Sequence, residues 1–168
     1  GESLSEVTHS FCDLWGISAS IIPMSDLPVS TIVQTEQGNL AFQDYFVKLA
    51  CKPEVRGFYF QDADNVDPAP GVLRAISESD LVIICPSNPW VSIAPILAVP
   101  GYLDLIKKKP VVAVSPIIGG KALKGPAAKM YAEWGFDPSA SAVADHYRDF
   151  LTGFVFDTVD AAELEKIQ

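Results

Sequence analysis

Two nearly unbroken apolar runs, at residues 81–85 and 111–115, constrain the fold of this chain more than any other feature. Within each run apolar residues follow one another without polar alternation, which is typical of a strand buried on both faces of a parallel sheet. A shorter run follows at 153–156, and segments with helical spacing separate the three. Parallel neighbours need a crossover, usually a helix. The chain therefore predicts an α/β fold, with a Rossmann-like parallel sheet and helices on both faces.

Capping and spacing signals place the helices of this half. We expect helices at 70–79, 92–98, 102–107, 126–134, 139–150 and 160–167. Pro70 and Pro126 suit the first turns of two of them, because a proline at the start of a helix loses no hydrogen bond.

The first half of the chain has a different order of expected helices and strands. Ser3 and Glu6 form a capping-box pattern ahead of an expected helix. In order, the segments expected here are a helix at 4–14, a strand at 17–22, an antiparallel hairpin of 29–35 and 40–42 around a turn at 37–39, a short helix at 43–49 and a strand at 55–60. We expect a single domain over 1–168, with 23–60 as a hairpin-containing subdomain.

Composition narrows the class of partner. The 168 residues are enough for one domain, and a net charge of −9 argues against broad nucleic-acid binding. No apolar run reaches the length of a membrane span and no signal peptide is visible, so we expect a cytoplasmic protein without a membrane partner. The three cysteines show no zinc spacing and are expected to be reduced thiols.

The strongest candidate site follows the strand at 81–85. Ser87 and Asn88 stand at its carboxyl end, Ser92 lies a few residues on, and a helix begins between them. Ligands of open α/β sheets lie at such strand ends, and a helix N-terminus favours phosphate. The alternative is that Ser87 and Asn88 only form a turn and cap the helix.

A second candidate follows the next strand. Its residues are Ser115, Gly119, Gly120, Lys121, Lys124 and Gly125. Paired glycines allow a ligand to approach the backbone closely, and lysines gathered in an acidic chain suit a diphosphate. The alternative is a loop with solvated lysines.

Two acidic positions are weaker candidates for holding Mg²⁺. Asp157 and Asp160 follow the run at 153–156, and a carboxylate at a strand end can bind the ion through water. Capping of the last helix is the alternative. A polar cluster at 24–26 reads equally well as a turn. The chain has no Walker A loop, GxGxxG fingerprint or catalytic triad pattern.

Several longer stretches together resemble one family, the 2-phospho-L-lactate transferases of coenzyme F420 biosynthesis. The stretches that carry the resemblance are 85–101 (CPSNPWVSIAPILAVPG), 112–120 (VAVSPIIGG), 124–127 (KGPA), 23–29, 42–46 and 155–157. The resemblance implies a Rossmann-like fold and transfer of a 2-phospholactyl or phosphoenolpyruvyl group from a GDP-linked donor to the deazaflavin alcohol FO. The products would be coenzyme F420-0, or its dehydro form, and GMP. It also implies Mg²⁺ and a homodimer.

The resemblance further implies that Ser87, Asn88 and the 119–124 loop hold the donor diphosphate, with Lys121 or Lys124 stabilising the leaving group. Family members open with a strand and a Gly-rich loop that are not seen here, so we expect the N-terminal part of the pattern, with its FO and metal sites, to be missing. The catalytic residues and metal ligands are not assigned. A sugar-nucleotide-binding regulator of the same fold and a non-catalytic nucleotide-binding or dimerisation fragment remain as alternatives.

Overall fold

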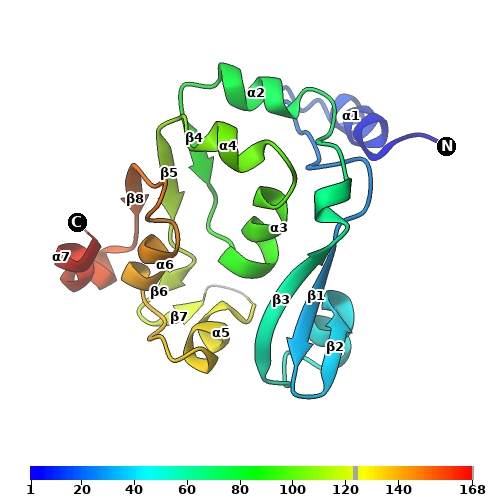
Figure 1. Ribbon diagram of the computed structural model, residues 1–168. Helices are drawn as coiled ribbons and strands as arrows, with labels where there is room; N and C mark the ends of the chain where they lie inside the picture. The colour runs from blue at the N-terminus through cyan, green and yellow to red at the C-terminus, as the bar shows by residue number, and fades with distance from the viewer. Residues whose placement is uncertain (123–124, 168) are drawn as a thin grey trace.

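The fold is that of a computed structural model, which describes residues 1–122 and 125–167, and its centre is a three-stranded parallel sheet (Figure 1). The strands are β4 (Val82–Ile84), β5 (Val111–Val114) and β8 (Gly153–Val155), in the order β4-β5-β8. Ile84 pairs with Ala113, which pairs with Phe154. The two apolar runs and the third shorter run therefore form the predicted strands, and the α/β class is confirmed.

Helices connect these strands. The helical elements of this half are α2 (Val72–Glu78), the π-helical turn η3 (Pro89–Ile93), α3 (Ala94–Leu97), α4 (Tyr102–Ile106), α5 (Ala127–Glu133), α6 (Ala140–His146), the 3-10 turn η4 (Thr158–Glu163) and α7 (Leu164–Ile167). The helix expected at 139–150 ends earlier, because the carbonyls of Ala144 and Asp145 accept turn-type bonds from Tyr147 and Arg148. All six expected helical segments are present.

The main core lies on one face of the parallel sheet. Ile84 and Ala113 are buried there against Tyr102 of α4 and Val143 of α6. On the other face Ile83 is 60% exposed. The strand order explains this asymmetry: it advances in one direction, so two right-handed crossovers bring both helical connections to the same face. The expected second helical layer does not cover Ile83 in the described part of the chain.

An antiparallel sheet forms the second unit. It consists of β1 (Ser30–Thr35), β2 (Gly38–Ala41) and β3 (Val55–Gln61), in the order β2-β1-β3. This confirms the predicted hairpin and adds β3 as its third strand, and a short π-helical turn, η1 (Asp44–Lys48), follows β2.

A second core joins this sheet to the parallel half. Val33, Tyr45, Val55 and Met130 of α5 are buried together in it, and Trp90 packs against both cores. The small sheet therefore stands beside the helices that follow β4 and β5, as Figure 1 shows.

The start of the chain departs from expectation. Helix α1 (Leu4–Leu14) begins with the predicted capping box of Ser3 and Glu6. The strand predicted at 17–22 is wrong, since this segment pairs with no strand among the described residues. Ile21 is 53% exposed. β-branched residues favour a strand only where a neighbouring strand packs against them, and this segment has no strand partner in the described structure.

Candidate functional site

A pocket of about 480 Å³ lies at the carboxyl ends of β4 and β5, where open α/β sheets place their ligands. Four segments line it: 86–88 and 91–92 after β4, Pro116 after β5, and 125–126 ahead of α5. Phe42 and Phe46 of the antiparallel unit complete it. The pocket is therefore built between the two units of the fold, and its described lining contains no charged side chain.

Ser87 and Ser92 supply the hydroxyl groups of this pocket. Both are partly buried, and neither hydroxyl has a hydrogen-bond partner among the residues described. A hydroxyl can donate one hydrogen bond and accept two, so both groups can bind a ligand's oxygen atoms. The predicted grouping of these two serines at the end of β4 is therefore present in the structure.

Asn88 lines the same pocket, but both polar atoms of its side chain already form hydrogen bonds within the protein. Its Oδ1 accepts from the N–H groups of Trp90 at 3.0 Å and Val91 at 3.3 Å, which caps η3. Its Nδ2 donates to Met130 Sδ at 3.3 Å. This is the capping role that the sequence left open as the alternative. Asn88 positions the turn that carries Ser92, and the short motif alone could not separate the two roles.

The paired glycines adopt a conformation that the sequence analysis did not foresee. Gly119 (φ 56°) and Gly120 (φ 74°) join two short strands, β6 (Ile117–Ile118) and β7 (Lys121–Ala122), as a two-residue hairpin turn. Turns of this kind need positive φ at both central positions, which glycine adopts without strain. These glycines therefore serve a tight turn, and neither they nor Lys121 line the strand-end pocket.

A buried carboxylate holds this hairpin. Both oxygens of Asp160 accept from the N–H of Gly119, each at 3.0 Å, and Asp160 is only 7% exposed. The amide is consequently occupied by an acidic side chain, which would repel a phosphate. The hydroxyl of Ser115 also has its partners within the protein. It is buried, donates to the carbonyl of Ile117 and accepts from the N–H of Ile117.

Of the described residues of the second predicted group, Gly125 alone lines the pocket, with φ at 73°. Lys124 lies outside the residues that the structure describes. Lys129, a third lysine of this stretch, forms an ion pair with Glu133 and donates to the carbonyl of Pro53 at 3.0 Å. It therefore ties α5 to the antiparallel unit.

The acidic candidates for Mg²⁺ have structural partners. Asp157 accepts from the N–H of Val159 and caps η4, as its alternative predicted. Asp160 is bonded to Gly119. No group of three or more His, Cys, Asp or Glu side chains gathers within residues 1–122 and 125–167. These residues do not fit a protein-built Mg²⁺ site.

Two phenylalanines of the pocket were missed as binding candidates. Phe42 follows β2 and Phe46 lies in η1, and their rings stack at a centroid distance of 5.4 Å with an interplanar angle of 16°. Phe46 is 40% exposed. Their four-residue spacing was visible in the sequence, but nothing there placed them against the end of β4.

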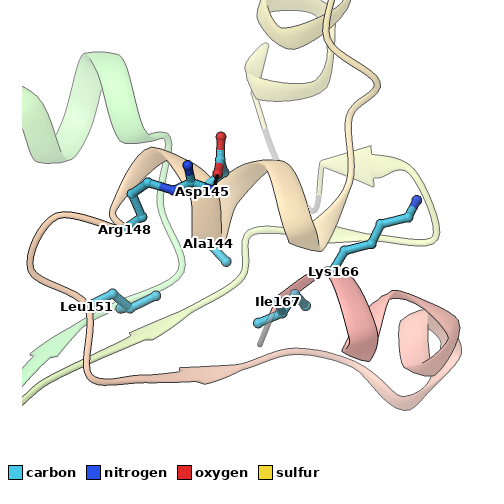
Figure 2. Close-up of a pocket in the computed structure, with 6 residues that line it drawn as sticks. All are labelled: Ala144, Asp145, Arg148, Leu151, Lys166 and Ile167. Carbon is cyan, nitrogen blue, oxygen red and sulfur yellow. Dashed lines mark ion pairs between the residues drawn. The ribbon is translucent and has the colours of Figure 1, made fainter.

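A smaller hollow of about 260 Å³ lies elsewhere, beside α6 and α7 (Figure 2). In Figure 2, Arg148, just beyond the end of α6, lies beside Asp145, while Lys166 extends outward from α7. Arg148 and Asp145 form an ion pair. Leu151, which also lines this hollow, precedes β8, so the hollow is at the amino end of that strand and apart from the candidate site.

Across the described residues, no helix has the length and apolar character needed to cross a membrane.

Comparison with known proteins identifies the family. The family model for 2-phospho-L-lactate transferase CofD matches residues 1–167. The chain is 44% identical over 163 residues to the 2-phospho-L-lactate transferase of Methanosarcina mazei, covering 97% of this chain and 54% of the relative. It is 43% identical over 166 residues to the phosphoenolpyruvate transferase of Thermobifida fusca, covering 96% of this chain and 52% of the relative.

A solved structure shares the fold. Protein BH3568 from Bacillus halodurans superposes with a TM-score of 0.64 at 17% identity, over 98% of this chain and 53% of that protein. At this identity the likeness concerns the fold alone. The chain spans about half the length of the curated relatives it matches. With a family match over nearly all of its residues, the chain belongs to the 2-phospho-L-lactate transferase CofD family.

Proposed function

We propose that this chain carries the donor-binding part of a transferase of coenzyme F420 biosynthesis. The reaction moves a 2-phospholactyl or phosphoenolpyruvyl group from a GDP-linked donor to the deazaflavin alcohol FO, and yields F420-0, or its dehydro form, and GMP. The observation that supports it best is the pair of unpartnered hydroxyls, Ser87 and Ser92, in an uncharged pocket at two parallel strand ends. The family relationship supports a transferase of this kind, and the GDP-linked donor and FO belong to the proposal.

The chemistry is a displacement at phosphorus. The hydroxyl oxygen of FO forms a bond to the phosphorus that bears the acid, the bond from that phosphorus to the GMP oxygen breaks, and the FO hydroxyl proton is released. Charge grows on the leaving phosphate, so groups that hydrogen-bond its oxygens lower the barrier. We assign that role to the hydroxyls of Ser87 and Ser92, held in place by the Asn88 cap.

The proposal includes Mg²⁺ and a homodimer. The described acidic residues offer the ion no ligand set of their own. If Mg²⁺ is required, addition of EDTA should abolish product formation. If the protein is a homodimer, light scattering should give twice the molecular mass of one chain.

Binding of GDP to the chain is the first test. We expect Ser87→Ala to weaken GDP affinity about tenfold or more, because a hydrogen bond to a charged group contributes about 1.5–3 kcal/mol. Ser77→Ala is the matched control, because Ser77 is exposed on α2 and lies outside the pocket. Equal GDP affinity in the wild-type chain and Ser87→Ala would contradict the assignment.

Turnover is tested in a chimera that carries this chain in place of the matching region of the Methanosarcina mazei relative. With FO, the GDP-linked donor and Mg²⁺, mass spectrometry should detect F420-0 and GMP in equal amounts. The Ser87→Ala chimera should form less of both. A chimera that binds UDP-sugars instead of GDP and forms no product would favour a regulatory protein of the same fold.

A further inference from the structure

We propose that Phe42 and Phe46 form the ring-binding wall of the strand-end pocket and stack against the planar heteroaromatic ring of a substrate. This inference rests on the proposed function, in which both substrates carry such a ring. It adds a binding surface from the antiparallel unit, whereas the phosphate contacts come from the parallel half.

The geometry of the pair suits a flat ligand. The two rings are nearly parallel, with an interplanar angle of 16° and a centroid distance of 5.4 Å, so they already form a stacked pair. Aromatic rings in proteins prefer such offset stacking at 4.5–7 Å, and a third ring can extend the stack on an open face. Phe46 is 40% exposed and lines the pocket, as does Gly125, which lies close to its ring.

Phe42 is also held in advance of binding. Phe42 packs against the second core together with Trp90 and Val91, and the Asn88 cap fixes the turn that carries both of those residues. A wall that is already ordered loses little side-chain entropy when a ligand arrives. Phe42 is therefore the ordered base of the wall, and the ring of Phe46 stacks on it.

The remaining lining explains why the ligand also needs a polar end. The pocket combines this aromatic wall with the hydroxyls of Ser87 and Ser92, and its described lining has no charged side chain. Pockets of this composition take ligands with a large apolar body and a few polar groups. The donor has that character, with a guanine ring and a diphosphate, and so has the acceptor, with a deazaflavin ring and a hydroxyl-bearing chain.

Titration of the whole chain with three probes tests the inference: GDP, inorganic pyrophosphate and riboflavin. Stacking of a base on an aromatic side chain contributes about 1–3 kcal/mol. Phe46→Ala should therefore weaken binding of the ring-bearing probe about tenfold or more and leave pyrophosphate binding unchanged. Phe46→Trp should restore it. Phe136→Ala is the control, because Phe136 is an exposed phenylalanine outside the pocket.

The outcomes separate this inference from the proposed function. Selective loss of GDP binding assigns the wall to the nucleotide, and selective loss of riboflavin binding assigns it to the acceptor. If Phe46→Ala weakens GDP and pyrophosphate equally, or weakens neither ring-bearing probe, the wall is disproved while the phosphate site stands. If wild-type protein binds none of the three probes, both proposals fail.

Discussion

Replacing Asp160 tests how the glycine hairpin is held and which way it faces. The carboxylate is 7% exposed and accepts the N–H of Gly119 with both oxygens at 3.0 Å. A hydrogen bond to a charged group contributes about 1.5–3 kcal/mol, and because Gly119 itself is exposed, its freed N–H can bond to water. Asp160→Ala should therefore lower the free energy of unfolding by about 2–3 kcal/mol. Asp160→Asn, which keeps one acceptor oxygen, should lose about 1 kcal/mol.

Thermal and urea denaturation measure this effect. For a chain of this size each kcal/mol shifts Tm by about 2–4 °C, so Asp160→Ala should melt about 4–12 °C lower. Asp157→Asn is the matched control, since it keeps an acceptor for the exposed cap of η4. GDP affinity, measured below the melting range, should stay unchanged because Gly119 lies outside the pocket. A variant with wild-type stability and lost GDP affinity would refute both parts of this reasoning.

Three further predictions concern Asn88, Tyr147 and His146. Asn88→Ala should destabilise the chain by about 1–2 kcal/mol in urea denaturation, since it removes the cap of η3, and Asn88→Asp, which keeps the acceptor oxygen, should lose less. Tyr147→Phe should leave stability unchanged or raise it by about 1 kcal/mol, because the Tyr147 hydroxyl is buried without a hydrogen-bond partner in the described structure; a loss above that amount would reveal a partner. The His146 ring lies edge-on against Trp90 and Tyr147, and burial lowers its pKa below the ordinary value. The unfolded chain therefore binds the proton at higher pH, so stability should fall as pH drops below the ordinary histidine pKa, and His146→Gln should lessen this fall in urea midpoints taken between pH 8 and pH 5.

The predictable part of the fold is the part whose signal is local and strong. The runs at 81–85 and 111–115 became β4 and β5 because an unbroken apolar run has few other ways to be buried. The run at 17–22 contains the same residue types but forms no strand, since strand formation depends on a partner that the run itself does not specify.

The site shows the same division between local and distant information. Ser87 and Ser92 were found because they follow a buried strand directly. Gly119 and Gly120 suit an anion-binding loop and a two-residue hairpin equally well in sequence, and the deciding contact comes from Asp160, 41 residues away. Phe46 reaches the pocket only because the antiparallel unit packs on α5 through a second core. Such long-range contacts cannot be read from spacing.

Trp90 makes the two halves of the fold mechanically dependent on each other. Its ring lies 4.3 Å from that of Tyr131 in the main core and 4.7 Å from that of Trp134, which contacts the second. Loosening either half removes packing from the same side chain, so the antiparallel and parallel units should unfold in one cooperative transition. Because the Trp90 backbone N–H is also bonded to Asn88, a ligand entering the pocket should be reported by tryptophan fluorescence and should raise the melting temperature of both halves together.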